Sequence, residues 1–256
     1  MRRIFETIYA FWGLICFSFF YIMVFPLFFI IAQVPKWHSF ANFINKLWAG
    51  FVFTSALMPV KIIWNEGIKK GQPYVFCPNH NSYLDIPIIG ISAPTFVVFV
   101  GKSSLGKIPG FGYMFKKIHI PVDRASIKSS YRSFELAKRA VDKGHSLLIF
   151  PEGGINTMNY PDLKKFKDGP FRIAIEKQIP IVPVTIPYNW IILYDISTRL
   201  KWKPVKVIYH KPIETKGMTL KDIDLLKEKV KRAIKGELKT YFPDKITIDT
   251  GNVRTV

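Results

Sequence analysis

The pattern of hydrophobic and polar positions divides the chain into an apolar N-terminal part and a longer part with short alternating segments. No charged residue occurs from Thr7 to Val34, and most positions there are aromatic or aliphatic. A helix over this run would be about 40 Å long, whereas a bilayer core needs about 20 residues. Pro26 lies inside the run and can kink such a helix. The sequence therefore predicts a membrane-embedded helical segment over residues 1–60, in which residues 39–60 form a second, weaker apolar helix at the interface.

Two alternative interpretations of this apolar segment remain open: a re-entrant helical hairpin, and a helix buried in the protein core. A signal peptide is disfavoured, because the run is too long and no small-x-small cleavage site follows it. Basic residues lie on both sides of the first helix. The distribution of positive charge therefore favours neither orientation across a membrane.

From residue 61 onward, short apolar runs alternate with amphipathic stretches, which is typical of an α/β layer fold. We predict one α/β domain over residues 61–243 and a polar tail over residues 244–256. Pro183 and Pro187 interrupt the apolar run 181–187 of the strand 179–186 and favour an edge position, because proline cannot donate to a ladder. Helices are predicted over 127–142, 168–178 and 219–242. Strands are predicted over 73–77, 96–100, 118–122, 146–150, 179–186 and 205–210.

The composition changes the picture of possible partners. The chain has 37 basic and 18 acidic residues, a net charge of +19, with 49% hydrophobic and 15% aromatic residues. Such a charge predicts an anionic partner, and a basic chain rich in Phe suits an anionic membrane lipid surface better than a nucleic acid. We therefore expect membrane lipid and no nucleic acid as partner. Cys16 and Cys77 lie in apolar surroundings and are predicted to be buried thiols, with no disulfide framework and no metal site.

The first candidate chemistry is the polar stretch from Asn79 to Asp85, between an apolar strand and an apolar helix. On a regular helix, His80 and Asp85 would point about 140° apart, so they meet only if the chain turns between them. Pro87 disfavours helix before it, which predicts that the helix starts near residues 82–85 and leaves His80 in the turn. His80 is then a candidate general base and Asp85 its orienting acid. The alternative is that Asp85 only caps the helix, alone or in a capping box with Ser82, and that His80 is a solvated loop residue.

Three further predicted strands end in residues that suit a substrate. Lys102 follows strand 96–100 in a run that nearly spells a phosphate-binding P-loop, but Ile108 has no hydroxyl for magnesium and a proline follows it. Arg124 carries a planar fork of donors that can bind a phosphate. Glu152 and Gly153 lie in a glycine-rich turn, where a ligand can approach the backbone and a glutamate can accept from a substrate hydroxyl or a protein donor.

These strand ends are expected to converge, because ligands of an open α/β sheet bind at the carboxyl ends of its strands. Each of Lys102, Arg124 and Glu152 also has a plainer interpretation, as a surface charge or an ordinary strand exit. The sequence contains no GxSxG nucleophile elbow and no HExxH zinc motif. We therefore predict no metal ion and no cofactor.

Taken together, the motifs resemble the glycerolipid acyltransferase family typified by 1-acylglycerol-3-phosphate O-acyltransferase, the lysophosphatidic acid acyltransferase. Residues 79–85 match its NHxSxxD motif, and Asp123-Arg124 is similar to its arginine-bearing second block. Residues 150–153 match the start of its FPEGTRS block, and residues 182–184 are similar to its fourth, proline-containing block. The resemblance spans roughly residues 70 to 190. It implies an acyltransferase fold with a mixed central sheet flanked by helices.

The resemblance implies a membrane-associated enzyme of phospholipid biosynthesis. Its donor would be an acyl thioester, acyl-CoA or acyl-carrier protein. Its expected acceptor is the lyso-lipid 1-acylglycerol 3-phosphate, which yields phosphatidic acid. His80 and Asp85 would be catalytic, and Lys102, Arg124 and the Glu152-Gly153 turn would bind substrate. The catalytic domain is expected on the cytoplasmic face of the inner or plasma membrane, because acyl thioesters are found there.

One departure from the family pattern concerns the acceptor. Gly154-Ile155 stands where the family usually has Thr-Arg, so the arginine expected to help hold the acceptor's phosphate is absent there. Arg124, Lys102 or a lysine of the run 164–167 could compensate. Alternatively, the acceptor is a different lyso-lipid, such as an acylated amino acid. A further alternative is a basic, non-catalytic membrane-binding protein.

Overall fold

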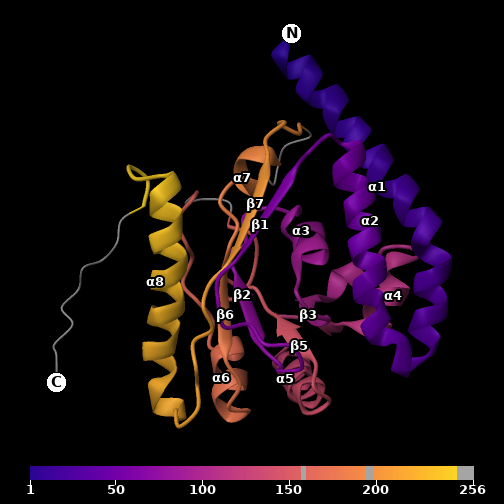
Figure 1. Cartoon of the computed structure of the whole chain (residues 1–256). Coiled ribbons are helices and arrows are strands. Elements are labelled where there is room, and N and C mark those ends of the chain that lie inside the picture. Colours follow the sequence, from indigo (N-terminus) through magenta and orange to yellow (C-terminus); the bar gives the residue numbers. More distant parts are fainter. Residues whose placement is uncertain (157–159, 194–198, 247–256) are drawn as a thin grey trace.

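The computed structural model describes residues 1–156, 160–193 and 199–246 (Figure 1). The strands in these residues are β1 (Val60–Trp64), β2 (Val75–Pro78), β3 (Val97–Lys102), β4 (Ile120–Val122), β5 (Ser146–Leu148), β6 (Ile181–Thr185) and β7 (Val205–Tyr209). The α-helices are α1 (Arg2–Gln33), α2 (Ala41–Ser55), α3 (Asp85–Ser92), α4 (Phe111–Ile118), α5 (Ile127–Asp142), α6 (Gly169–Glu176), α7 (Asn189–Ile192) and α8 (Ile223–Tyr241). Three short 3-10 helices are η1 (Pro35–Phe40), η2 (Ser103–Lys107) and η3 (Leu220–Asp222).

The described strands form one seven-stranded sheet in the order β1-β7-β6-β2-β5-β3-β4. Its neighbours pair in parallel, except β6 and β7, which are antiparallel. The predicted α/β class with a mixed central sheet is therefore confirmed. Because β2, β5, β3 and β4 are adjacent and parallel, their carboxyl ends lie along one edge of the sheet.

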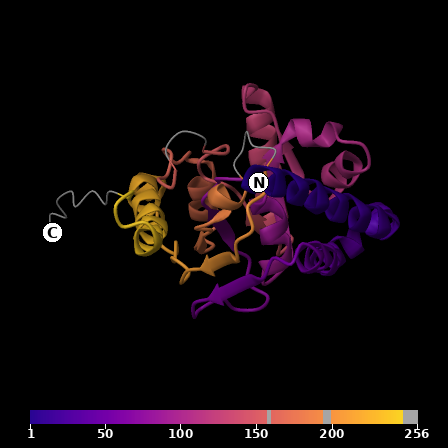
Figure 2. The ribbon, with the colours of Figure 1, turned by 90° about the horizontal axis from the view of Figure 1, so that it is seen from above.

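Both faces of the sheet are covered, as the alternation of buried side chains along β2 shows. Val75 and Cys77 belong to one hydrophobic cluster, to which α6 and α8 contribute, and Phe76 belongs to the other, to which α2 and α3 contribute. In both views α8 lies on the far side of the sheet from the N-terminal hairpin of α1 and α2 (Figures 1 and 2). The sheet is thus the middle layer of the protein.

Four strands and α-helices differ from the sequence prediction: α4, α7 and β1 were not predicted, and β6 is not at the edge. The strand β1 was not predicted; it is a five-residue edge strand without a fully buried side chain, so it lacks a clear apolar pattern. The strand β6 is central, so the expected edge position is wrong. The Pro183 carbonyl still accepts from His210 N, and Pro183 lies opposite Cys77 of β2. The missing N–H of Pro183 therefore removes one hydrogen bond to β7, at the end of the short β6–β7 ladder, and no hydrogen bond to β2.

The N-terminal residues form a helical hairpin in which α1 and α2 lie side by side, joined by η1 (Figure 1). Among the described residues, α1 is the one helix long and apolar enough to cross a membrane, and only 17% of its most apolar window is buried. This contradicts the interpretation of α1 as a core helix. The end of the hairpin next to η1 is nevertheless buried in the hydrophobic cluster that contains Val75 and Cys77. Its residues there are Phe28, Ile31, Ala32, Ala41 and Ile44.

The cysteines and two helix caps complete the description of the fold. Cys16 and Cys77 are free, buried thiols, as expected. The Ser126 side chain accepts from Ser129 N and caps α5, and Thr219 and Asp222 form a capping box. Most of the predicted polar tail 244–256 lies outside the described residues.

Leu147 offers a test of the central layer, because it is 0% exposed in β5, between β2 and β3. We expect Leu147→Ala to lower the free energy of unfolding by about 2–5 kcal/mol, through lost burial and the cavity left behind. The matched control is Leu225→Ala on α8, where the leucine is 52% exposed and the cost should be below about 1 kcal/mol. Chemical denaturation of both variants measures this difference, and equal losses would contradict the layer arrangement.

Candidate active site

The turn after β2 is fixed to the neighbouring strand by Asn79. Its Nδ2 donates to the Ile186 carbonyl at 3.0 Å, and its Oδ1 accepts from Ile186 N at 2.7 Å. Asn79 is buried, so both of these bonds are shielded from water. They tie the end of β2 to the residue that follows β6. The chain therefore leaves the sheet in a fixed direction at the residue before His80.

His80 and Asp85 are in contact, as the turn geometry predicted. The His80 Nδ1 and Asp85 Oδ2 atoms are 2.8 Å apart, and α3 begins at Asp85. The same oxygen accepts from Asn81 N at 2.9 Å and Ser82 N at 3.0 Å. The other oxygen accepts from Asn189 Nδ2 at 2.6 Å. The two interpretations of Asp85 are thus compatible, because one carboxylate both binds the turn's N–H groups and orients the histidine.

The surroundings of His80 fix both its backbone and its ring. Its N–H donates to Glu152 Oε1 at 2.8 Å, and its carbonyl accepts from Asn156 N at 2.8 Å. The imidazole stacks on the Phe150 ring, with centroids 3.8 Å apart and planes 18° apart. Because an ionised Asp85 only accepts, the His80 proton lies on Nδ1. The Nε2 atom, which has no hydrogen-bond partner in the described part of the chain, then carries the free lone pair.

Glu152 links two loops to this turn. Its Oε1 binds His80 N, and its Oε2 accepts from Lys164 N at 2.9 Å. The side chain is 4% exposed, and this burial raises the pKa of Glu152 to about 7. Both partners of Glu152 are protein N–H donors, which is one of the two alternatives predicted for this glutamate. These contacts give Glu152 a positioning role. Direct binding of substrate by Glu152 stays a prediction.

The glycine-rich turn at residues 153–155 is surrounded by basic side chains. The Arg124 Nη1 atom donates to the Gly153 carbonyl, and Gly153 has a φ of +75°. The Lys164 Nζ atom donates to the Ile155 carbonyl at 2.6 Å. A Cβ on Gly153 would lie 3.3 Å from the Lys167 side chain. The cations proposed to compensate for the missing arginine therefore include two, Arg124 and Lys164, that contact this turn directly.

Lys102 is at the same edge of the sheet but makes no such contact. It ends β3, pairs in register with Val122 of β4, and is exposed. In the described chain, Lys102 forms no side-chain hydrogen bond or ion pair with the other site residues. Its role as an anion ligand stays a prediction.

Sequence reasoning missed three residues that complete the site: Phe150, Asn156 and Asn189. Asn189 is 104 positions from Asp85 along the chain, and no local pattern connects them. The rule on strand ends could have indicated Asn189, because it is the first amide side chain after the carboxyl end of β6. Phe150 was matched only as part of the family block; its stacking role could have been found because it is the large apolar residue just after β5. Asn156 contributes a backbone N–H to His80, which no side-chain pattern reveals.

Comparison with known proteins now identifies the family. The family model described as Acyltransferase matches residues 59–187, which is half of the chain and includes every site residue named above except Asn189. The chain belongs to the acyltransferase family. An uncharacterized acyltransferase of Schizosaccharomyces pombe is 32% identical, covering 72% of this chain and 67% of the yeast protein.

Other members of the acyltransferase family carry more specific names. The chloroplastic 1-acyl-sn-glycerol-3-phosphate acyltransferase LPAT1 of Arabidopsis thaliana is 29% identical over 72% of this chain and 52% of its own length. A chloroplastic 1-acyl-sn-glycerol-3-phosphate acyltransferase of Brassica napus is 31% identical over 68% of this chain and 51% of its own. The chain thus spans about half the length of these two relatives.

The fold of this acyltransferase matches a solved structure. The crystal structure of the 1-acyl-sn-glycerophosphate acyltransferase PlsC from Thermotoga maritima aligns with a TM-score of 0.77 and 20% identity. The alignment covers 97% of this chain and 100% of that chain. The likeness therefore includes the N-terminal hairpin as well as the α/β domain.

The pKa of Glu152 yields a prediction for stability against pH. In the unfolded chain this carboxyl ionises near pH 4.5, but in the folded protein only near pH 7. Between these values the unfolded state binds fewer protons, so stability from this group is greatest below pH 4.5 and falls as the pH rises to 7. In Glu152→Gln this fall should disappear. Relative to the variant, the unaltered protein should lose on the order of 3 kcal/mol of unfolding free energy across that range. Unfolding of both proteins at several pH values measures this difference, and a constant difference would contradict the assignment.

Proposed function

We propose that this protein transfers a fatty acyl group from an acyl thioester to the free hydroxyl of a lyso-lipid. The proposed acceptor is 1-acylglycerol 3-phosphate, and the product is phosphatidic acid. The observation that carries the proposal is the His80–Asp85 pair, 2.8 Å apart and held by three further donors on the carboxylate. The names of the Arabidopsis and Brassica relatives support the choice of acceptor.

His80 acts as the general base of this reaction. With its proton on Nδ1 and bound to Asp85, the imidazole presents the Nε2 lone pair to the acceptor hydroxyl. As Nε2 takes the hydroxyl proton, Asp85 stabilises the imidazolium that forms. Stacking on Phe150 prevents the ring from turning away. Acid–base work of this kind contributes typically about 10²–10⁴-fold to the rate.

The acyl transfer itself needs no enzyme nucleophile, because the thioester is already activated. The hydroxyl oxygen attacks the thioester carbonyl and forms the new C–O bond. The C–S bond then breaks, and the proton held by His80 passes to the departing sulfur. The donor is acyl-CoA or acyl-carrier protein, and the chemistry is the same for both.

The acceptor's phosphate is assigned to the basic side chains around the glycine-rich turn. Arg124 contacts Gly153, and Lys164 contacts Ile155, at the place where the family usually has its arginine. Arg124 and Lys164 belong to other parts of the chain than position 155, where the family usually has its arginine. This arrangement supports a phosphate-bearing acceptor in spite of the Gly154-Ile155 departure.

Membrane association is proposed through the outer surface of the hairpin. Large apolar side chains are exposed along α1 and α2, including Phe5, Phe11, Phe19, Ile22, Phe29, Phe43 and Phe51. Exposed apolar surface on this scale is typical of contact with membranes or partner proteins. The catalytic domain would face the cytoplasm, where acyl thioesters are available.

The second candidate function keeps the chemistry and changes the acceptor to another lyso-lipid, such as an acylated amino acid. Gly154-Ile155 is the observation that favours it. Incubating the purified full chain with labelled acyl-CoA or acyl-carrier protein and a panel of lyso-lipids decides between the acceptors. Absence of transfer to every acceptor would favour a non-catalytic membrane-binding protein.

Replacing His80 tests the proposed base. We expect His80→Ala to lower turnover by at least about 10²-fold, because no other group takes the hydroxyl proton. Turnover is measured with labelled donor, and the unfolding temperature serves as the control, since it should stay near that of the unaltered protein. Near-normal turnover in the folded variant would remove His80 from the mechanism.

Replacing Arg124 tests the phosphate site. Arg124→Lys keeps the charge but loses the planar fork, so the acceptor's apparent KM should rise roughly tenfold while the donor's KM stays unchanged. Arg232→Lys on the exposed face of α8 is the matched control and should alter neither constant. An unchanged acceptor KM in Arg124→Lys would contradict the assignment.

A further inference from the structure

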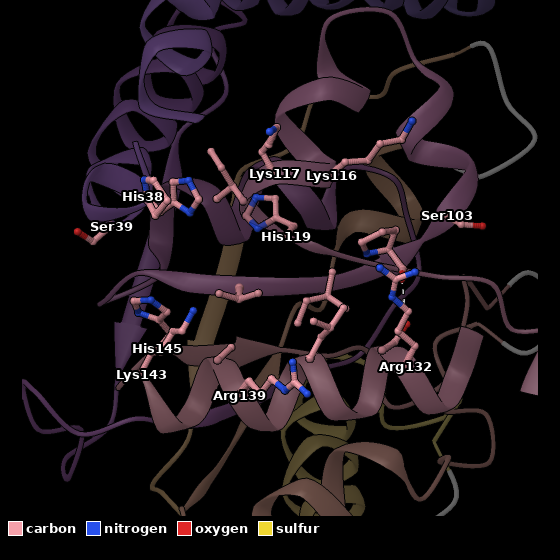
Figure 3. A pocket seen from close by; sticks show the side chains of 18 of the residues that line it. His38, Ser39, Ser103, Lys116, Lys117, His119, Arg132, Arg139, Lys143 and His145 are labelled. Carbon is pink, nitrogen blue, oxygen red and sulfur yellow. Dashed lines mark hydrogen bonds between the residues drawn. The ribbon is translucent and has the colours of Figure 1, made fainter. Parts of the chain in front are cut away.

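A second concave site lies beside the edge strand β4, apart from the proposed catalytic residues (Figure 3). It is a cavity of about 950 Å³ between α4, α5 and η1. Residues of α5 from Ser129 to Ala140, and Lys143 directly after the helix, line it along almost the whole helix. His80, Asp85, Arg124 and Glu152 are not among its lining residues. We call this cavity the α5 groove.

The charge of the α5 groove is of one sign. No Asp or Glu is among its lining residues, whereas six of them are Lys36, Lys116, Lys117, Arg132, Arg139 and Lys143. In the part of the chain that the structure describes, none of these six forms a salt bridge. Figure 3 shows the arginines of α5 on one side and Lys116 and Lys117 on the other. Cations that face one cavity without acidic partners suit a phosphate group.

Three histidines add to this surface: His38, His119 and His145. Burial lowers the pKa of His145, and the charge of Lys143 lowers it further. The buried Nε2 atom of His38 has no hydrogen-bond partner among the described residues. The groove therefore holds an unused polar group in a positive field.

The short helix η1, which lines one side of the groove, also carries exposed apolar side chains. Along η1, Lys36 and Ser39 line the groove, while their neighbours Trp37 and Phe40 are 52% and 53% exposed. The exposed apolar surface continues onto α2 through Phe43. A soluble polyphosphate would use only the cations, but a phospholipid would use the cations and the adjoining apolar surface together.

We propose that the α5 groove binds the phosphate-bearing headgroup of an anionic membrane lipid, whose acyl chains lie against Trp37 and Phe40. This would be a lipid site separate from the proposed catalytic one. It would attach the α/β domain to the membrane at the edge strand, next to the hairpin. The proposal rests on the groove alone and does not depend on acyl transfer.

The test measures binding of short-chain phosphatidylglycerol to the full chain in neutral detergent, because this anionic lipid is neither the proposed acceptor nor the product. The groove variant combines Arg132→Gln and Arg139→Gln on α5 with Lys143→Gln directly after it, all at exposed positions. The control variant combines Lys221→Gln, Lys229→Gln and Lys239→Gln, which removes the same charge from the side of α8, across the sheet from the hairpin (Figures 1 and 2).

We expect the groove variant to bind phosphatidylglycerol at least about tenfold more weakly, and the control variant to bind within about twofold of the unaltered protein. Equal losses in the two variants would overturn the proposal, because binding would then follow net charge. A groove variant that loses coenzyme A binding but keeps phosphatidylglycerol binding would assign the groove to a soluble polyphosphate instead.

A substitution that leaves the charge unchanged tests whether the lipid occupies the cavity itself. Ala140 lines the groove, and Ala140→Phe would partly fill it without altering any charge. Weaker binding of phosphatidylglycerol, with an unchanged unfolding temperature, would support occupation of the cavity. Unchanged binding in this folded variant would show that the lipid does not enter it.

Discussion

The buried carboxylate of Asp85 is the constraint on which the site depends. It is 1% exposed, and a carboxylate in such a place is stable only when hydrogen bonds replace its water. Four donors do so: His80 Nδ1, Asn81 N, Ser82 N and Asn189 Nδ2. The turn must adopt one conformation to supply them. The direction of the histidine ring is therefore a consequence of satisfying the carboxylate, and the start of α3 follows from the same bonds.

The sequence was informative where a short stretch determines its own geometry. Pro87 restricts the residues before it, so the meeting of His80 and Asp85 could be predicted within one turn. Contacts between distant segments could not, because Asn189 reaches Asp85 only through the sheet order that places β6 beside β2. The same order made the edge prediction for β6 wrong, since proline costs little at the end of a ladder. The strand β1 was missed because it is a short edge strand without a fully buried side chain, so its pattern is weak.

The basic turn at residues 153–155 shows how one function can be redistributed along a chain. The family motif places its arginine two residues after the glycine, but here that position is the apolar Ile155. Arg124 arrives after β4 and Lys164 from the loop before α6, and both bind carbonyls of this turn. The motif alone lacks the arginine of this site, whereas the folded chain surrounds the same turn with positive charge.

The packing of the hairpin onto the α/β domain has a geometric consequence. Phe28 and Ile31 of α1 are buried in the same cluster as Val75 and Leu147 of the central strands. The hairpin and the sheet thus share one hydrophobic cluster. In a membrane-bound molecule, this packing would fix the height of the His80 imidazole above the lipid plane. A fixed height would favour acceptors whose reactive hydroxyl stands out of the bilayer by a matching distance.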